Sequence, residues 1–248
     1  MPGTAANNEV AILAPDGQTV VEGGAFARCV AGGPATANSI AAFGTLFGDG
    51  VTGGSGGSNL STLGGTLRPG EIAPGRQGAR HALRVNIDGP HDLWPGTTAT
   101  CFRWPATRCD SYGPSGGASP PYGGTNPKLT MGALLAIPAS VDLTTLGLSP
   151  AGLEVAWTMQ NFGAYVVNDS ARSVFTIATE TGDASTLNQF QTDWSFPFET
   201  VDASGSSSWG HDLQTIISHL SVIDNNGPNS IGGGGTPLQP LAPPLLGP

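Results

Sequence analysis

Four acid or base side chains of this sequence stand where a catalytic group could be placed: Glu71, His81, Asp110 and Asp169. Glu71 and His81 fall on consecutive predicted strands, so pairing of these strands could bring the carboxylate to the imidazole. Asp110 begins a glycine-rich loop, and Asp169 ends a short apolar segment. Two carboxyl groups can hydrolyse a glycosidic bond, one protonating the leaving oxygen and the other acting as nucleophile or base. We therefore predict these four residues as the catalytic groups.

Four further residues could bind a sugar beside those groups. Arg84 and Arg103 each fall on a predicted strand, and an arginine can neutralise the carboxylate of an acidic sugar, as a lyase requires. Trp104 and Tyr122 belong to the aromatic residues that gather between positions 94 and 122. Flat aromatic faces beside polar loops suit the C–H faces of sugar rings. These residue types are compatible with a glycoside hydrolase and with a polysaccharide lyase.

Each candidate also has a structural interpretation. His81 begins the row of Leu83, Val85 and Ile87 on one strand face, so it could be a core histidine bonded to a backbone carbonyl. The alternative is that this row lines a cleft, where His81 could act as a base or bind a metal. A carboxylate at the end of a strand is more often a cap or a turn ligand than a catalytic group.

Other chemistries are not expected. The segments 53–57 and 113–117 both match G-x-S-x-G, but neither is followed by a predicted helix, which the nucleophile turn of a serine hydrolase requires. His211 and His219 are eight residues apart, whereas a metal-binding helical pair is usually four apart. No Cys/His cluster suggests zinc, and no Gly-Lys-Ser/Thr occurs. We expect no metal and no cofactor.

The net charge of the chain limits the kinds of molecule that it can bind. The chain of 248 residues has nine Lys and Arg against 18 Asp and Glu, and its formal net charge is −9. Affinity for nucleic acid comes largely from clustered Lys and Arg, so this balance excludes a nucleic-acid partner. It equally disfavours attachment to an anionic membrane surface, and no apolar run approaches the roughly 18–20 residues that span a bilayer.

The cysteines indicate the compartment. Cys101 and Cys109 flank seven residues that a turn could close into a disulfide, the alternative being two buried free thiols. Cys29 is left over, either buried or reactive. A disulfide indicates a secreted, extracellular protein. The start, Met1–Thr4, is not a signal peptide, so we expect the leader to be absent from this chain.

Short apolar segments with a period of two, ending in Gly, Pro, Asn or Asp, predict a fold built of strands. The predicted strands are 9–13, 19–21, 67–72, 81–87, 98–104, 129–137, 165–167 and 174–178. The glycine-rich stretch from 31 to 65 reads as a long loop over the sheet. A helix is predicted from Pro150 to Gly163 with Ser149 as N-cap, and shorter helices near 185–194 and 209–220.

We therefore predict an all-β fold, one antiparallel β-sandwich of jelly-roll or lectin-like type with a few peripheral helices. Residues 1–226 are expected to form this single domain. Residues 227–248 form a Gly/Pro-rich arm that packs on the domain or on a neighbouring chain, which would give a homo-oligomer. The arm carries four leucines that could contact a groove: Leu238, Leu241, Leu245 and Leu246.

Four segments together resemble a family of secreted bacterial proteins of unassigned activity. They are His81–Arg84 (HALR), Trp104–Ala106 (WPA), Met131–Gly132 (MG) and Phe162–Asp169 (FGAYVVND). The resemblance covers roughly residues 55–180. It implies a secreted setting, since many members occur in polysaccharide-degrading bacteria. The family often has a histidine after the Pro-Ala pair, whereas this chain has Thr107–Asp110 there. This difference argues against a metal site with two histidines and favours Asp110 as the functional residue of the segment.

The leading hypothesis is a secreted carbohydrate-active enzyme, a glycoside hydrolase or polysaccharide lyase, that cleaves an extracellular polysaccharide or oligosaccharide. A second hypothesis is a non-catalytic glycan-binding module in which the aromatic loops matter and the carboxylates do not. A third is a structural or assembly protein whose C-terminal arm docks into a neighbouring subunit.

Overall fold

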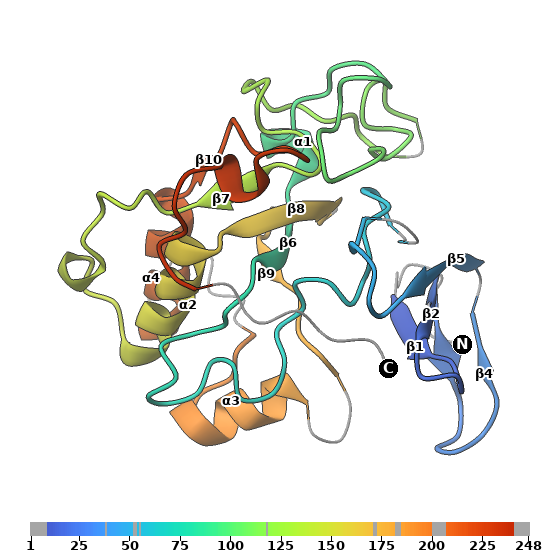
Figure 1. The fold of residues 1–248 in the computed structure, drawn as a ribbon, viewed down its shortest axis with the longest axis horizontal. Helices are drawn as coiled ribbons and strands as arrows, with labels where there is room; N and C mark the ends of the chain where they lie inside the picture. The colour runs from blue at the N-terminus through green and yellow to red at the C-terminus, as the bar shows by residue number, and fades with distance from the viewer. Residues whose placement is uncertain are drawn as a thin grey trace.

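The predicted all-β sandwich is wrong, because the chain combines helices with a mixed sheet (Figure 1). The computed structural model describes residues 9–37, 39–51, 54, 56–117, 119–170, 173–181, 185–199 and 207–240. None of the helices in these ranges is long and apolar enough to cross a membrane.

A five-stranded sheet forms the centre of the molecule. Its strands, in spatial order, are β10 (Ser221–Val222), β7 (Leu134–Ala136), β8 (Ala164–Asp169), β6 (Leu83–Ile87) and β9 (Thr176–Ile177). The central pair, β6 and β8, is parallel, and every other pair in this sheet is antiparallel. Parallel neighbours require a long crossover between them, which a simple antiparallel sandwich does not contain.

The helix α2 (Pro150–Asn161) lies in that crossover, between β7 and β8 in the chain. Its prediction is confirmed, because the Ser149 side chain accepts a hydrogen bond from the backbone N–H of Gly152 and Pro150 occupies the first turn. Gly163 follows the helix with φ of +78°, a conformation that only glycine adopts without strain. Its Cα also lies so close to the backbone of Leu135 that no Cβ would fit.

The N-terminal residues form a separate antiparallel sheet, seen at the right of Figure 1. It contains β1 (Val10–Leu13), β2 (Thr19–Gly24) and β5 (Ser39–Thr45). The predicted hairpin of the first two strands is confirmed, and the Asp16 carboxylate fixes its turn by accepting the backbone N–H of Gln18 and Thr19 at 2.9 and 2.8 Å.

The predicted long loop from 31 to 65 is only partly correct, because β5 lies within it and pairs with β2. A two-stranded ribbon, β3 (Ala27–Arg28) with β4 (Ala35–Thr36), precedes it. The strand β5 was not predicted because Ser, Ala and Gly make up four of its seven residues. Such residues have low strand propensity and give no clear alternation of apolar side chains.

Other predicted strands are shorter or missing. Segment 98–104 is a turn rather than a strand, because the backbone N–H of Cys101 donates to the carbonyl of Thr97 at 2.8 Å. Segment 67–72 contributes only an isolated bridge between Leu67 and Thr179. The apolar run 129–137 supplies only the short strand β7, and before it Met131 forms an isolated parallel bridge with Phe102.

The remaining helices lie around the central sheet (Figure 1). They are α1 (Gly89–Asp92), α3 (Thr186–Trp194), α4 (Ser208–Ser218) and the 3₁₀ turns η1 (Leu143–Thr145) and η2 (Ile231–Gly233). The two helices predicted near 185–194 and 209–220 are thus confirmed. An aromatic cluster joins α3 to α4, with the ring centroid of Phe190 5.0 Å from that of Phe198 and 5.1 Å from that of Trp209.

The described part of the predicted C-terminal arm, residues 227–240, contains a local turn next to Asn226. Gly227 and Ser230 form an antiparallel bridge, and the Asn226 side chain accepts the N–H of Gly232 at 2.9 Å. Residues 241–248, with Leu241, Leu245 and Leu246, lie outside the described residues, and the boundary at 226 stays a prediction.

We expect Phe190→Ala to lower the free energy of unfolding by about 3–5 kcal/mol, because the buried ring fills the junction of α3 and α4. Urea denaturation followed by tryptophan fluorescence measures this change. Gln191→Ala, at the exposed next position, is the control and should change stability by less than about 0.5 kcal/mol. Equal stability of the two variants would show that the aromatic cluster does not support the fold.

Candidate functional site

The carboxyl ends of the parallel strands β6 and β8 bring several acidic side chains together. The register pairs Ile87 with Asp169, so Asp88, the residue after β6, comes next to the end of β8. In α/β sheets, ligands bind outside the carboxyl ends of parallel strands, because the chain leaves the sheet there. The loop that carries Asp110 and Tyr122 reaches the same edge, where the backbone N–H of Gly123 donates to the carbonyl of Gly89 at 3.2 Å.

Two tyrosines hold two aspartates at this edge, and we call these four residues the Asp–Tyr cluster. The Tyr122 hydroxyl donates to Asp110 Oδ2 at 2.6 Å and accepts the backbone N–H of Asp110 at 3.3 Å. The Tyr112 hydroxyl donates to Asp169 Oδ2 at 3.0 Å. The two rings meet edge to face, with their centroids 6.1 Å apart. The cluster therefore has a fixed arrangement.

Backbone groups complete the surroundings of Asp169. Its Oδ1 accepts the N–H of Gly89, the first residue of α1, at 2.9 Å. Asp88 lies just before this helix, and its Oδ2 is 2.6 Å from Nδ1 of His91. The other oxygen, Asp88 Oδ1, is buried and has no hydrogen-bond partner among the described residues. The edge thus carries a concentration of acid groups.

Glycine backbones approach the cluster too closely for any other residue. A Cβ on Gly57 would lie 2.6 Å from Asp110 Oδ2, and a Cβ on Gly89 would lie 2.9 Å from the Tyr122 ring. The carbonyl of Gly56 accepts hydrogen bonds from the Arg108 side chain at 2.7 and 3.2 Å, which fixes the same turn. The glycine-rich stretch is therefore part of the wall of the site.

Burial sets the proton affinity of Asp110. Loss of solvent around its carboxyl raises the pKa, and repulsion from Asp169 adds to the rise, whereas the Tyr122 hydroxyl and Arg108 oppose it. The pKa values of Tyr112 and Tyr122 are raised well above normal by burial and by the neighbouring carboxylates. Both tyrosines therefore stay protonated and act as hydrogen-bond donors at neutral pH. Burial and the charge of Asp88 also raise the pKa of Asp92.

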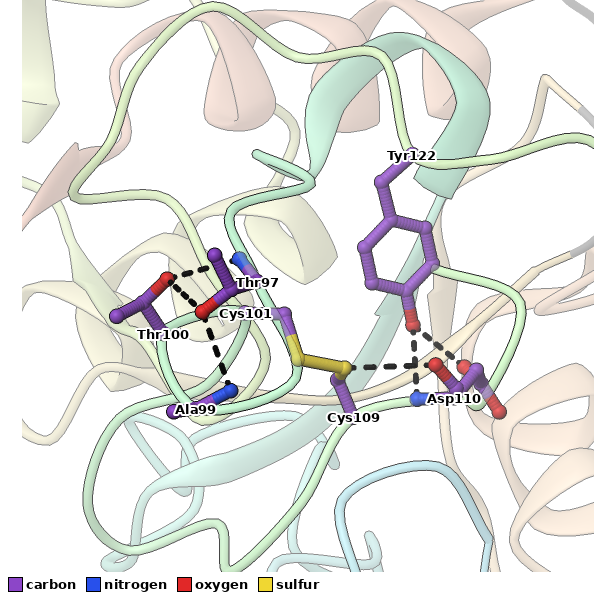
Figure 2. The surroundings of a disulfide bond; sticks show 7 residues. All are labelled: Thr97, Ala99, Thr100, Cys101, Cys109, Asp110 and Tyr122. Atoms are coloured by element: carbon purple, nitrogen blue, oxygen red, sulfur yellow. Dashed lines mark hydrogen bonds between the residues drawn. A yellow bond between two sulfur atoms is a disulfide. The ribbon is translucent and has the colours of Figure 1, made fainter. Parts of the chain in front are cut away.

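The predicted disulfide between Cys101 and Cys109 is confirmed, with the two Cα atoms 5.9 Å apart (Figure 2). Cys109 directly precedes Asp110, and Cys101 is fully buried in the turn that Thr97 begins. The cross-link therefore ties the chain that carries Asp110 to the protein interior. Cys29 is a free thiol at an exposed position.

Glu71 and His81 form the predicted pair, with His81 Nε2 3.0 Å from Glu71 Oε2. His81 Nδ1 is 2.9 Å from the carbonyl of Ala82, so both ring nitrogens are engaged. Burial acts to raise the pKa of Glu71, but the bonds from His81 and from the backbone N–H of Arg68 outweigh it and hold the pKa below normal. This arrangement resembles a structural ion pair.

The pair lies at the opposite end of β6 from the Asp–Tyr cluster. His81 precedes the strand, whereas Asp88 follows it. At about 3.3 Å per residue, the strand separates these ends by roughly 20 Å. The structure therefore joins Asp110 to Asp169 and Glu71 to His81, but it does not bring the four predicted catalytic residues into one site.

The predicted binding residues are used in other ways. Arg84 is 3% exposed and forms an ion pair with Glu9. Arg103 donates to the carbonyl of Lys128 at 3.2 Å and pairs with Asp224, which fastens the C-terminal segment. Trp104 is half-buried.

Tyr122, predicted as a stacking surface, is only 2% exposed and instead positions Asp110 through its hydroxyl. Tyr112 belongs to the predicted group of loop aromatics, but its contact with a carboxylate was not predicted, although it follows Asp110 by two residues. Its signal was only this proximity, because its partner Asp169 is 57 residues further along the chain.

Comparison of the chain with protein-family models, with curated proteins and with solved structures finds no match. Among the described residues, no group of three or more His, Cys, Asp and Glu side chains is arranged to hold a metal ion. The Asp–Tyr cluster holds two carboxyl groups in different surroundings. Asp110 can retain a proton, and Asp169 is a second carboxylate held by two donors.

The raised pKa of Asp110 makes folding stability depend on pH. An aspartate with a higher pKa in the folded chain binds more protons there, so stability falls as pH rises from the ordinary value of 3.8 through the raised pKa. Asp110→Asn removes this loss of stability, because an amide does not titrate. Its amide oxygen can still accept the hydrogen bond from Tyr122. In urea titrations from about pH 4 to about pH 7, stability of the variant should fall less than that of the wild type.

Asp142→Asn is the control with the opposite sign. Hydrogen bonds from Thr144 lower the pKa of Asp142, so its stabilisation is present above the ordinary pKa and is lost as pH falls. The same pH dependence in Asp110→Asn as in the wild type would contradict a raised pKa.

Proposed function

We propose that the protein is a secreted glycoside hydrolase that cleaves an extracellular polysaccharide at the Asp–Tyr cluster. The observation that carries this proposal is the pair of aspartates, Asp110 and Asp169, each bonded to one of two tyrosines whose rings are in contact, beside the carboxyl ends of the parallel strands. Hydrolysis of a glycosidic bond uses two carboxyl groups with different protonation states.

In this proposal Asp110 is the general acid. Its partial burial and the nearby charge of Asp169 favour the protonated form, which an acid needs to protonate the leaving oxygen. Asp169 is the nucleophile or the base, since the N–H of Gly89 and the hydroxyl of Tyr112 both donate to its oxygens. Tyr112 donates to Asp169 and its ring meets that of Tyr122, which donates to Asp110, so the two tyrosines keep the carboxyl groups in position.

The charge of the site favours a hydrolase over a lyase. Asp88 and Asp92 add two acid groups beside the cluster, and this charge would repel an acidic sugar. The same charge stabilises the positive, oxocarbenium-like transition state of glycoside hydrolysis. A lyase would need an arginine for the sugar carboxylate. The two predicted arginines, Arg84 and Arg103, are paired with Glu9 and Asp224. Arg108, beside Asp110, is bonded to the carbonyl of Gly56. We therefore propose a polysaccharide of neutral sugars as the substrate.

Secretion is part of the proposal. The Cys101–Cys109 disulfide fits an oxidising compartment, where such bonds persist. An extracellular polysaccharide would be within reach of an enzyme in that compartment. The resemblance of the segments around His81, Trp104 and Asp169 to secreted bacterial proteins points the same way.

We expect Asp110→Asn and Asp169→Asn each to lower hydrolysis by at least about 10²–10⁴-fold, because each variant removes one catalytic proton transfer or attack. The measurement is release of reducing ends from a panel of neutral polysaccharides. Asp142→Asn, an exposed aspartate at a helical turn, is the matched control and should keep full activity. His81→Gln should also keep activity, because it lies at the other end of β6.

Full activity of Asp110→Asn, or a wild type that cleaves no polysaccharide in the panel, would refute the proposal. Binding of a polysaccharide without cleavage would identify a glycan-binding module instead.

Removal of the disulfide should affect activity more than folding. We expect Cys101→Ser/Cys109→Ser to lose about 2–3 kcal/mol of stability, the cross-link entropy of so short a loop, and to remain folded. Because Asp110 directly follows Cys109, activity should fall at a temperature where circular dichroism still shows native structure. Simultaneous loss of both signals on heating would give the disulfide a structural role alone.

A further inference from the structure

A polar cavity of about 400 Å³ lies on the other side of the Gly56–Gly57 turn from the Asp–Tyr cluster. It is lined by β1, by the segment 62–68, by β6 and by the segment 178–181. Its volume falls in the range of small-molecule sites in proteins.

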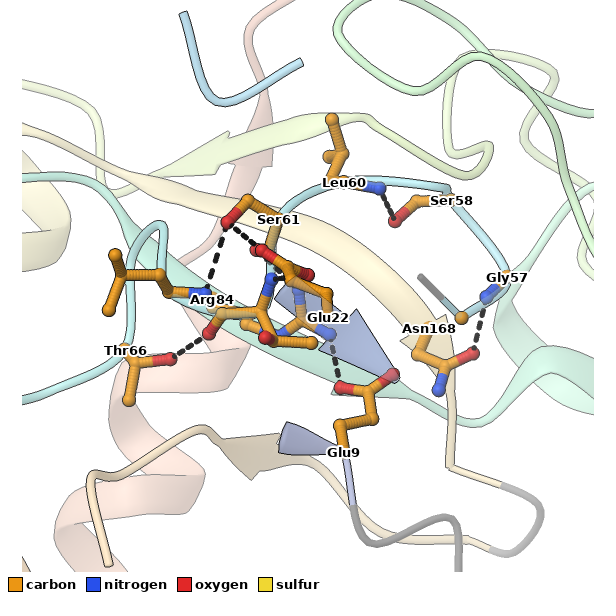
Figure 3. A network of polar contacts seen from close by, with 12 residues as sticks. Glu9, Glu22, Gly57, Ser58, Leu60, Ser61, Thr66, Arg84 and Asn168 are labelled. Carbon is orange, nitrogen blue, oxygen red and sulfur yellow. Dashed lines mark hydrogen bonds and ion pairs between the residues drawn. The ribbon is translucent and has the colours of Figure 1, made fainter. Parts of the chain in front are cut away.

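The Gly56–Gly57 turn connects the cavity to the cluster. A Cβ on Gly56 would lie 2.6 Å from Oε1 of Glu9, which lines the cavity, and a Cβ on Gly57 would lie 2.6 Å from Asp110 Oδ2. The Asn168 side chain contacts the same turn, accepting the N–H of Gly57 at 3.2 Å. Figure 3 shows Glu9 and Arg84 on one side and Gly57 with Asn168 on the other.

A buried arginine forms the inner wall of the cavity. Arg84 pairs with Glu9 and donates to the carbonyl of Ser61 at 2.9 Å (Figure 3). Ser61 in turn donates through its hydroxyl to Glu22, which is 1% exposed and also accepts the N–H of Thr62 at 2.8 Å. These contacts fix the guanidinium in one position before any ligand binds.

The lining specifies the chemistry of a ligand. The charged residues of the lining are two arginines and two glutamates, so their charges balance: Glu9, Arg68, Arg84 and Glu180. Threonine side chains of the lining supply hydroxyl groups. The Thr62 hydroxyl is buried and has no hydrogen-bond partner among the described residues. A ligand with net charge would leave this balanced set with an uncompensated charge, whereas a neutral ligand rich in hydroxyls can both donate and accept.

We propose that this cavity binds one neutral sugar unit of the polysaccharide, as a binding subsite beside the Asp–Tyr cluster. The inference rests on the proposed hydrolase function, from which it takes neutral sugars as the class of ligand. It adds a site that holds the polysaccharide next to Asp110, with Glu180 and the threonine hydroxyls as its hydrogen-bonding groups.

The test measures sugar binding separately from cleavage. Saturation-transfer NMR and calorimetry with glucose, galactose, xylose and arabinose are applied to the full chain carrying Asp110→Asn, which blocks cleavage and leaves the cavity lining unchanged. We expect at least one of these sugars to bind. Thr181→Trp, at an exposed position of the lining, should fill the cavity and weaken binding more than tenfold. Thr192→Trp, on the exposed face of α3, is the matched control and should leave binding unchanged.

A second variant tests the cavity without introducing a large side chain. Glu180→Gln, also exposed, should weaken the same sugar about five- to tenfold by replacing a charged hydrogen-bond acceptor with a neutral amide. Equal binding by Thr181→Trp and the control, or displacement of the sugar by glycine as a zwitterionic probe, would overturn the inference. Sugar binding that is lost in Thr181→Trp, in a protein that cleaves no polysaccharide, would uphold the subsite and reject the hydrolase.

Discussion

The parallel pairing of β6 with β8 is the constraint on which the rest of the structure depends. Two parallel strands cannot be joined by a hairpin, so the chain must cross over between them, and α2 lies in that crossover. The same pairing places both carboxyl ends at one edge of the sheet. Asp169 therefore comes next to the start of α1, where the N–H of Gly89 becomes its hydrogen-bond donor. A purely antiparallel sandwich would have sent these ends to opposite edges.

Local features could be predicted wherever neighbouring residues determine them. The N-cap at Ser149 and the turn at Asp16 specify their structures through hydrogen bonds within three residues, and the Cys101–Cys109 spacing limits what the two thiols can reach. The fold class could not be predicted in this way. Short apolar segments look alike in parallel and antiparallel strands, and only the long-range pairing distinguishes them.

The candidate site shows the same limit. Asp110 and Asp169 could be chosen singly, as carboxylates at the ends of segments, but their association depends on tyrosines in a loop without periodicity. Glu71 and His81 were correctly paired from sequence because only ten residues separate them. Proximity in sequence therefore predicted a pair that lies away from the proposed site. In the proposed site, Asp110 lies within the crossover and Asp169 ends the strand that follows it.

The partners of the carboxylates distinguish their roles in a chain with few charged residues. Glu71 and Asp224 contact cationic side chains, which lower their pKa values and keep them ionised as structural anions. Asp110 is held instead by the neutral hydroxyl of Tyr122, so burial dominates and its pKa rises. The Tyr122 hydroxyl donates to this carboxyl and favours its ionised form, but burial outweighs that effect. A carboxyl with a raised pKa can retain its proton closer to neutral pH, which the proposed general acid requires and a structural anion does not.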